Sequence, residues 1–420
     1  MRFSIIAIGD ELLLGNVVDT NTPFMASLID ANGWQLVHSC QVHDDPCDIL
    51  FAVRDALNRS DVVLTTGGLG PTKDDITKQV LCECFGGKLV YDESVAENVR
   101  RIFAERGLPM NRLTESQAMV PDCCTVLPNL TGTAPVMWFE RDNKVLVSMP
   151  GVPREMRYTF TDQVIPRLKK LINGAVSEHP MLHSFYLLEG ISESDLDTML
   201  ESPSTPAPLR DIHVAYLPQT GYLKIRLDSD DADVLANASA QFRELAGQYI
   251  FATGDVTPER AVIDTLYDRR LTLSTAESCT GGNIAHMITS VPGSSAIYNG
   301  SVVSYSNDMK INAINVPAED IARYGAVSTQ VATAMADGVA LLADTTCSVS
   351  TTGIAGPGGA TPGKPVGTVC IGIHTPLGTA ASTHHFNGNR AEVIERASVR
   401  ALILLLRALT PTPPNQHIKH

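Results

Sequence analysis

The chain has 420 residues, 44% of them hydrophobic and 19% charged, which is enough for several folded domains. Its formal net charge of −14 at pH 7 argues against direct binding to nucleic acid, because phosphate backbones are bound by clustered Lys and Arg. No apolar run reaches the roughly 18 residues of a membrane helix, and the nine cysteines lack paired CxxC spacing. We therefore expect a cytoplasmic protein with reduced thiols and no membrane contact.

The first 172 residues alternate β-branched runs with amphipathic segments, a pattern typical of a parallel sheet covered by helices. We expect residues 1–172 to form a three-layer α/β domain. Strands are predicted at "FSIIAIG", "WQLVHSCQV", "DVVLTT", "APVMWFE" and "KVLVSM". Helices are predicted at "NTPFMASLIDANG" and "DPCDILFAVRDALNRS", from Ile76 onward, and after "PGVPREM" to about Ile172.

Three loops that follow these strands, "GDELLLG", "GGLGPTKDD" and "PGVPREM", are rich in glycine and acidic residues. Because the carboxyl ends of parallel strands meet at one edge of a sheet, these loops should line one crevice. Their glycines let backbone N–H groups approach a phosphate, and Asp74 and Asp75, joined by Asp10 and Glu11, are suitable ligands for a hard cation. The Rossmann fingerprint GxGxxG is absent, and "GGATPGKP" has Pro365 where a P-loop requires Ser or Thr.

From about residue 180 to 253 the pattern changes to a βαββαβ order, which suits a small split α+β domain. This segment contains neither a phosphate loop nor an acidic cluster. We expect it to space the flanking domains or to form a homodimer. Strands are predicted at "SFYLL", "IHVAYLP", "YLKIRLD" and "QYIFA", and helices at "SESDLDTML" and "ADVLANASAQFRELAG".

Strands and helices alternate again over residues 258–410, and we expect a second three-layer α/β domain there. The Pro-rich residues 411–420 are predicted to be a flexible tail. Helices are predicted at "AVIDTLYDRR", "NIAHMITS", "TQVATAMADGVALLA" and "RAEVIERASVRALILLLRAL". Strands are predicted at "LTLSTA", "GSVVSYS", "CSVSTTG", "GTVCIGIHT" and "TAASTHHF".

The stretch "AESCTGG" follows the strand "LTLSTA" and contains three candidate nucleophiles. If Ser278 lies on the turn after the strand, the amides of Thr280, Gly281 and Gly282 can form an oxyanion hole beside it. Its base would be a lysine kept neutral by burial. "GSVVSYSNDMK" supplies Tyr305 and Lys310 at the end of the next strand, and adjacent parallel strands would bring both to the same edge.

Other interpretations of this stretch remain open. Cys279 is the better intrinsic nucleophile, but no His or carboxylate is evidently arranged for it, and a buried structural thiol is the simpler interpretation. Ser278 could also be an ordinary helix cap. The Ser/Tyr/Lys set of short-chain dehydrogenases is disfavoured, because their spacing is YxxxK and four residues separate Tyr305 from Lys310 here.

The loop "TTGIAGPGG" also follows an apolar strand, and its amides could take a phosphate. It repeats the pattern TTGxxGP of the first domain, although such small residues can coincide by chance. Arg390, just before the last predicted helix, could supply a bidentate phosphate contact, with an ordinary solvated arginine as the alternative.

"GDELLLGNVVDTN", "TTGGLGPTKDD" and "PGVPREM", in this order, resemble the molybdopterin-binding-type domain that opens the CinA family of competence/damage-inducible proteins. The resemblance implies a metal-dependent ADP-ribose pyrophosphatase that produces AMP and ribose 5-phosphate. In related molybdenum-cofactor enzymes this fold binds a pterin phosphate, so binding without hydrolysis is the alternative. The resemblance implies Asp10, Glu11, Asp74 and Asp75 as ligands of a divalent metal such as Mg²⁺, and Gly9, Asn21, Gly67, Gly68 and Gly70 as contacts of ADP-ribose.

"AESCTGG", "VPGSSAIYNGSVVSYSNDMK", "TGIAGPGG" and "KPVGTV" resemble the C-terminal domain of the same family, a nicotinamide mononucleotide deamidase. The resemblance implies conversion to nicotinate mononucleotide and ammonia without a metal or other cofactor. We expect a bifunctional enzyme of pyridine-nucleotide salvage; the alternative is a nucleotide- or pterin-binding regulatory protein linked to DNA uptake. The implied residues are Ser278, Tyr305 and Lys310 for catalysis, and Thr280, Gly281, Gly282, Gly293, Thr352, Gly353 and Arg390 for substrate binding.

Overall fold

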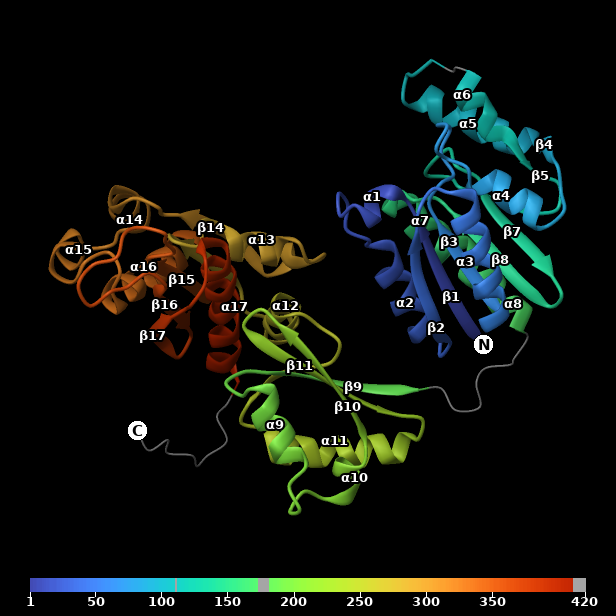
Figure 1. Cartoon of the computed structure of the whole chain (residues 1–420). Helices are drawn as coiled ribbons and strands as arrows, with labels where there is room; N and C mark the ends of the chain where they lie inside the picture. The colour runs from blue at the N-terminus through green and yellow to red at the C-terminus, as the bar shows by residue number, and fades with distance from the viewer. Residues whose placement is uncertain (110–111, 173–180, 411–420) are drawn as a thin grey trace. The chain divides into compact units, whose positions relative to one another are not determined.

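A computed structural model describes residues 1–109, 112–172 and 181–410. The predicted flexible tail, 411–420, lies outside the described residues. Contacts between residues divide the chain into two compact units, Met1–Met181 and Leu182–His420, and each is described by itself (Figure 1). Among the described helices, none combines the length and the hydrophobicity needed to cross a lipid bilayer.

The first unit is built on a six-stranded sheet in the order β2-β1-β3-β8-β7-β6 (Figure 1). The strands β2, β1, β3 and β8 pair in parallel, whereas β7 and β6 are antiparallel to their neighbours. This parallel core confirms the α/β class predicted for the domain. The strands are β1 (Arg2–Ile8), β2 (Gln35–Val42), β3 (Val62–Thr66), β6 (Thr125–Leu127), β7 (Val136–Arg141) and β8 (Lys144–Met149).

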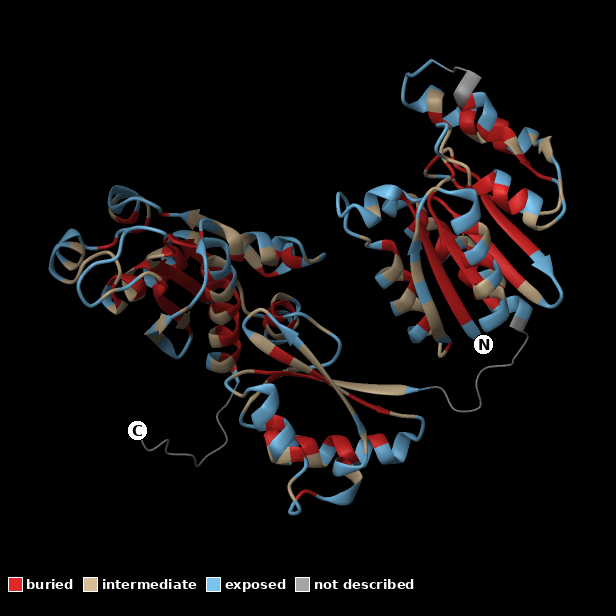
Figure 2. Ribbon diagram, viewed as in Figure 1, coloured by how far each residue is buried: buried red, intermediate tan, exposed pale blue. Residues whose placement is uncertain are grey.

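Helices cover both faces of this sheet, so the strands carry continuous apolar runs. In β1, Phe3 and Ile5 pack into the core under α2, α7 and α8, whereas Ile6 and Ile8 pack under α3 and α4. Figure 2 shows the resulting buried strands between partly exposed helices. The helices are α2 (Asn21–Ala31), α3 (Pro46–Arg59), α4 (Thr77–Cys84), α7 (Pro153–Thr159) and α8 (Ile165–Ile172).

Two parts of this unit were not predicted. The four-residue helix α1 (Asp10–Leu13) follows β1 directly. Between α4 and β6, a small subdomain has its own apolar core, which includes Val95, Val99 and Val120. Its elements are β4 (Leu89–Tyr91), α5 (Glu93–Glu105), α6 (Arg112–Glu115), the 3₁₀ turn Ser116–Ala118, and β5 (Met119–Pro121), which pairs antiparallel with β4.

The second unit begins with a four-stranded antiparallel sheet in the order β10-β11-β9-β12. Its elements follow the predicted βαββαβ order, with one additional short helix, α10 (Ala207–Arg210). Leu196, Leu235 and Phe242 pack helices α9 and α11 against the sheet. The elements are β9 (Leu182–Leu188), α9 (Glu193–Leu200), β10 (His213–Gln219), β11 (Tyr222–Ser229), α11 (Ala232–Ala246) and β12 (Ile250–Thr253).

The rest of the second unit is a five-stranded sheet in the order β14-β13-β15-β16-β17, again between two helical layers. β14, β13 and β15 are parallel, and β16 and β17 continue the sheet antiparallel. The strands are β13 (Leu273–Glu277), β14 (Tyr298–Val303), β15 (Cys347–Gly353), β16 (Thr368–Thr375) and β17 (Gly378–His385). Helices α12 (Pro258–Arg269), α13 (Asn283–Thr289) and α17 (Arg390–Leu409) cover one face; α14 (Asn307–Ile314), α15 (Ala318–Tyr324) and α16 (Thr329–Ala343) accompany the other.

Candidate active site

Ser278 is the first residue after β13, at the edge of the sheet where parallel strands end. Its backbone N–H donates to the carbonyl of Thr351 in the neighbouring strand β15, at 2.9 Å. The serine is 8% exposed, so its hydroxyl lies in a sheltered position that a small group can reach. The predicted location on the turn after the strand is confirmed, and Ser278 caps no helix, because α13 begins only at Asn283.

Lys310 lies on α14, the helix that follows β14, and its side chain turns back toward Ser278. The adjacent strands β13 and β14 are parallel, as predicted, so both residues reach the same edge. Lys310 is 1% exposed. Its Nζ donates to Ser278 Oγ at 3.0 Å and to the backbone carbonyls of Ser304 at 2.8 Å and Tyr305 at 3.3 Å. A hydroxyl and an amine are therefore in direct contact inside the protein.

Burial lowers the pKa of Lys310, while the nearby Cys279 opposes the shift. Among the described residues, its hydrogen-bond partners are a hydroxyl and two carbonyls and include no carboxylate, so a positive charge on the buried amine would lack an ion-pair partner there. In the neutral form, its two N–H groups would still satisfy the two carbonyls. The remaining lone pair would then face the Ser278 hydroxyl, which is the arrangement of a general base and its nucleophile.

Cys279 does not share this arrangement. It is 6% exposed, and burial raises the pKa of its thiol to about 12. Because only the thiolate is a strong nucleophile, the neutral thiol is inert at physiological pH. This property favours the structural interpretation of Cys279 and leaves Ser278 as the candidate nucleophile.

The turn after Ser278 uses two of its four backbone donors, Gly281 and Gly282, internally. Gly281 N–H donates to the Ser278 carbonyl at 3.2 Å, and Gly282 N–H donates to the Glu277 carboxylate at 3.0 Å. Both glycines were predicted as oxyanion donors, but these bonds make their amides unavailable. In the described part of the chain, the amides of Cys279 and Thr280 donate to no other residue. The available oxyanion donors are therefore the two amides directly after Ser278.

Tyr305 is placed differently from the expectation. Its side chain is 59% exposed, and its hydroxyl accepts from Arg390 Nη2 at 2.9 Å. The hydrogen bond that Tyr305 makes with Lys310 is through its backbone carbonyl, at 3.3 Å. Arg390, the first residue of α17, also donates from Nη1 to the Gly356 carbonyl at 2.7 Å. The phenol therefore lies at the rim of the site with Arg390, rather than between Ser278 and Lys310.

The other predicted contacts of this site fall in two places. Thr352 and Gly353 end β15, beside Ser278, and Thr352 Oγ1 donates to the Ala326 carbonyl at 2.7 Å. Gly353 is tightly enclosed, because a Cβ there would lie 2.7 Å from the Thr368 carbonyl. Gly293 precedes β14, whereas the site residues follow β13 and β14. The structure therefore places Gly293 at the opposite end of the sheet and does not bring it to the site.

Glycines occupy the corresponding strand ends of the first unit. At Gly67, a Cβ would lie 2.0 Å from the Ile8 carbonyl, and at Gly68 it would lie 2.1 Å from Thr77 Oγ1. Both positions have positive φ and exclude a side chain. Asn21 Nδ2 donates to Thr66 Oγ1 at 2.9 Å and to the Gly151 carbonyl at 2.8 Å. Its buried Oδ1 has no partner among the described residues.

Acidic side chains gather beside these glycines. Burial, followed by the charges of Asp10, Glu11 and Asp75, raises the pKa of Asp44, although a hydrogen bond from Asp10 N–H opposes the shift. That bond to Asp44 Oδ2 is 3.0 Å long. A hydrogen bond with His43, 2.8 Å long, lowers the pKa of Asp10. Asp44 was not predicted as a ligand. It follows β2, and the loop after this strand was not included with the three glycine-rich loops.

The two predicted acids at the start of the next helix behave unequally. Asp75 accepts from the backbone amides of Gly70 at 2.7 Å and Thr72 at 2.9 Å, so it holds its own loop. A Cβ at Gly70 would lie 2.3 Å from the Asp75 carboxylate. At Gly9, a Cβ would lie 2.6 Å from the carboxylate of Glu11. Asp74 is exposed, and no side-chain hydrogen bond of Asp74 occurs in the described ranges.

Whether these acids suit a metal ion depends on the other ligands that the ion would have. Within residues 1–109, 112–172 and 181–410, no three His, Cys, Asp or Glu side chains are arranged to enclose one ion. Asp10 and Asp44 nevertheless fit a cation that arrives with a diphosphate. Mg²⁺ is usually held by one or two carboxylates together with phosphate oxygens and water. Their crowded negative charge also favours such an ion.

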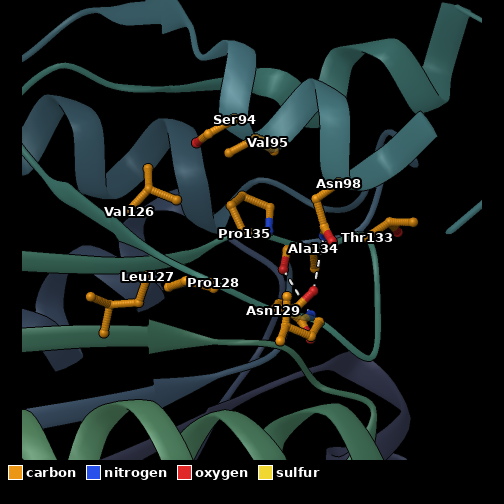
Figure 3. Close-up of a pocket in the computed structure, with 11 residues that line it drawn as sticks. Ser94, Val95, Asn98, Val126, Leu127, Pro128, Asn129, Thr133, Ala134 and Pro135 are labelled. Carbon is orange, nitrogen blue, oxygen red and sulfur yellow. Dashed lines mark hydrogen bonds between the residues drawn. The ribbon is translucent and has the colours of Figure 1, made fainter. Parts of the chain in front are cut away.

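A separate pocket lies between α5 and the segment before β7 (Figure 3). Its volume is about 250 Å³, and its walls contain no charged side chain. Asn98 Nδ2 donates to the carbonyls of Asn129 and Gly132, and Asn129 Nδ2 donates to Ala134 and to Glu155. Because these amides already bond to the loop, they are not available to a ligand in the pocket, and the strand ends remain the candidate site of this unit.

Two segments of the chain match known protein families. Residues 256–409 match the CinA C-terminal domain, and residues 4–170 match a family described as "Probable molybdopterin binding domain". A CinA-like protein of Flavobacterium psychrophilum is 39% identical, and the match covers 97% of this chain and 99% of that protein. The chain belongs to the CinA family. The family resemblance inferred from the sequence motifs is thereby confirmed.

Other members of the family show similar likeness. A CinA-like protein of Gemmatimonas aurantiaca is also 39% identical, over 97% of this chain and 96% of that protein. Among solved structures, CinA from Thermoplasma acidophilum shares 32% sequence identity with a TM-score of 0.36; the match covers 41% of this chain and 98% of that one.

Proposed function

We propose that the second unit hydrolyses the carboxamide of nicotinamide mononucleotide to nicotinate mononucleotide and ammonia. The observation that carries this proposal is the 3.0 Å contact between Lys310 Nζ and Ser278 Oγ. Both side chains are at least nine-tenths buried, and the lowered pKa of Lys310 favours the neutral amine that such a reaction needs. Membership of the CinA family and the motif resemblance supply the substrate.

In the proposed first half-reaction, Ser278 Oγ attacks the carboxamide carbon while Lys310 Nζ takes the hydroxyl proton. The carbonyl oxygen becomes an oxyanion, for which the amides of Cys279 and Thr280 are available. Lys310 then donates its proton to the amide nitrogen, the C–N bond breaks, and ammonia leaves. The product is an ester of Ser278 with the nicotinate group.

The second half-reaction repeats the same proton transfers with water. Lys310 takes a proton from the water that attacks the ester carbon, and the new oxyanion meets the same two amides. The C–O bond to Ser278 then breaks, and the proton returns to Ser278 Oγ. One amide and one water thus give one carboxylic acid and one ammonia, and no step requires a metal or an oxidant.

Arg390 is the proposed contact for the substrate phosphate. Two of its nitrogens donate to Gly356 and Tyr305, which holds the guanidinium at the rim of the site. A guanidinium has five N–H donors, so others remain for a phosphate. Thr352 and Gly353, which end β15 beside Ser278, are the other proposed contacts of the substrate.

The test is incubation of the purified chain with nicotinamide mononucleotide, followed by measurement of ammonia and identification of the nucleotide product. We expect equal amounts of ammonia and nicotinate mononucleotide. The matched control is Ser278→Ala, which should release neither. Release of nicotinamide instead of ammonia would mean cleavage of the glycosidic bond and would refute the proposal.

For the first unit we propose hydrolysis of ADP-ribose to AMP and ribose 5-phosphate. This proposal is supported by glycines that cannot carry a side chain and by the carboxylates of Asp10 and Asp44 beside them. A divalent cation held there would offset the charge of a diphosphate and lower the pKa of an attacking water. ADP-ribose incubated with and without Mg²⁺ should give the two products only with the ion. Binding without products would favour the alternative, a nucleotide- or pterin-binding module with a regulatory role.

A further inference from the structure

Glu277, the last residue of β13, is a carboxylate that the proposed reaction does not use. It is 0% exposed, at the end of a strand whose other four residues are also buried. Its Oε2 accepts from Thr280 Oγ1 at 2.7 Å, from Gly282 N–H at 3.0 Å and from Ile284 N–H at 3.1 Å. Its Oε1 accepts from Ala285 N–H at 2.8 Å. One side chain thus holds four donors of the segment that follows Ser278.

The nature of these partners requires a carboxylate. All four are donors at hydrogen-bonding distance, and a carboxylate is the only protein side chain with two oxygens that can accept from all of them. A glutamine would turn its NH₂ group toward amide N–H groups, so at least one of the four bonds would be replaced by a donor facing a donor. A buried donor left unpaired is destabilising, because it has lost its hydrogen bond with water without gaining another.

Besides the bonds to Glu277, the turn before α13 has local backbone bonds from Gly281 N–H to the Ser278 carbonyl at 3.2 Å and from Asn283 N–H to the Thr280 carbonyl at 3.1 Å, but its glycines make it intrinsically flexible. Gly281 and Gly282 have φ of 63° and 101°, and a Cβ built on Gly281 would meet nothing within 4 Å. Two consecutive glycines give the backbone wide freedom unless hydrogen bonds fix it. Thr280 Oγ1 links the carboxylate to Thr351 Oγ1 at 2.6 Å, and the Thr351 carbonyl accepts from Ser278 N–H. Glu277 therefore restrains the turn from within, on both sides of the candidate oxyanion amides.

We propose that Glu277 is a positioning residue of the deamidase site, which fixes the glycine turn so that Ser278 Oγ faces Lys310 Nζ while the amides of Cys279 and Thr280 point at the oxyanion. This inference rests on the proposed function, because it takes Ser278 as the nucleophile. In the described part of the chain, no hydrogen bond joins Glu277 to Lys310, so Glu277 would act through the turn. Its carboxylate also accepts from the amides of Gly282, Ile284 and Ala285. These three amides are therefore not available to an oxyanion.

The test compares Glu277→Gln with Glu319→Gln, the same chemical change at an exposed residue of α15. A displacement of about 1 Å at a reacting group can cost about 100-fold in rate. For Glu277→Gln we expect kcat for nicotinamide mononucleotide to fall about 100-fold while KM stays within about threefold. Glu319→Gln should match the wild type. Loss of affinity at unchanged kcat would overturn the positioning role.

A double variant separates positioning from a general loss of structure. If Glu277 acts through the Ser278–Lys310 pair, Glu277→Gln combined with Lys310→Met should be no slower than Lys310→Met alone. Full multiplication of the two effects would mean that Glu277 acts independently of the pair and would overturn the inference. Should Glu277→Gln fail to fold, as seen by thermal unfolding, Glu277→Asp keeps the carboxylate and shortens its reach. We then expect partial activity from it; wild-type kcat would contradict the inference.

A second readout is independent of the natural substrate. p-Nitrophenyl acetate should acetylate Ser278, and the modified peptide can be identified by mass spectrometry. We expect Glu277→Gln to slow this acetylation about 100-fold relative to Glu319→Gln. If wild-type Ser278 is acetylated but nicotinamide mononucleotide is untouched, the proposed function fails while the role of Glu277 is still measured. Equal acetylation of both variants would refute the role of Glu277 alone.

Discussion

The two strand-end sites of this protein look alike in sequence but differ in how completely they are assembled. In the second unit, Ser278 and Lys310 are in contact, and both are buried. In the first unit, glycines without room for a side chain occupy the strand ends, but the nearby acids are bonded to loop amides and to His43. No three ligating side chains of the described residues surround a common point there. The candidate catalytic residues of the second unit therefore meet without a ligand, whereas the candidate metal ligands of the first unit do not enclose an ion.

This difference follows from the chemistry that each site is proposed to perform. A serine hydroxyl and a lysine amine can lie side by side, because they form a hydrogen bond with each other and the neighbouring carbonyls accept the other N–H groups of the amine. Several carboxylates repel one another and approach closely only around a cation; burial, followed by the charges of the neighbouring carboxylates, raises the pKa of Asp44. Glycine loops at strand ends therefore predict where a ligand binds, and the partners of the side chains indicate whether the site is complete beforehand.

The largest expected effect would test the complete site. Ser278→Ala should reduce deamidation at least about 1,000-fold, because the nucleophile is removed. Cys279→Ser should stay within about fivefold of the wild type, since its buried thiol is not a nucleophile at neutral pH. Ammonia release from nicotinamide mononucleotide measures both. Retained activity in Ser278→Ala together with its loss in Cys279→Ser would reverse the assignment.

The incomplete site should respond to removal of metal instead. EDTA should suppress cleavage of ADP-ribose about 100-fold or more, because the cation that neutralises the diphosphate is lost. Deamidation in the same sample should change less than about twofold, since Lys310 and Ser278 need no ion. Both products can be followed in one reaction by chromatography. Loss of both activities together would show that the two sites are not independent in this respect.

Within the first unit, Asp44→Asn should sharpen the same contrast. Removal of one carboxylate from the pair with Asp10 should lower ADP-ribose cleavage about tenfold to 100-fold and raise the Mg²⁺ concentration needed for half-maximal rate. Deamidation should be unaffected. Asp74→Asn is the matched control, because Asp74 is exposed and lies outside the cluster. Equal effects of the two variants would argue against Asp44 as a ligand.

Much of the architecture could be predicted because it depends on local patterns. The apolar run of β1 is buried on both faces, as strands of a covered parallel sheet are, and it was recognised from composition. The subdomain around β4 and α5 was not, because its strands have only three residues each. Such short strands owe their structure to tertiary packing on Val95 and Val99, which no local pattern reveals.

Site residues could be predicted only where the order and direction of the strands determine which side chains lie close together. Ser278 and Lys310 meet because parallel neighbouring strands end at one edge, a rule that needs no coordinates. The same rule applied to β2 would have found Asp44. Glu277 carried a usable signal, since an acid that ends an apolar strand is either exposed or heavily hydrogen-bonded. The orientation of Tyr305 carried none, because a side chain after a strand can turn either way.

The pH dependence offers a smaller but more specific test of the complete site. Lys310 must be neutral to act as a base, and burial lowers its pKa, so the fraction of active enzyme rises with pH up to that pKa. Below it, kcat/KM for deamidation should increase about tenfold per pH unit and then level off. The control is cleavage of ADP-ribose in the same buffers, which should not follow this curve. A deamidase profile that falls with rising pH would contradict a lysine base.

Tyr305→Phe should give the smallest effect, and it measures how far the preassembled site extends. The Tyr305 hydroxyl contacts Arg390 at the rim, and Lys310 contacts only the backbone of Tyr305. The variant should therefore raise KM about threefold, through a less fixed Arg390, with kcat nearly unchanged. A fall in kcat of about 100-fold would instead mean that the phenol takes part in the proton transfer and that it swings inward when substrate binds. The ratio of the two parameters thus decides whether the third member of the predicted trio belongs to the chemistry or to the binding of the nucleotide.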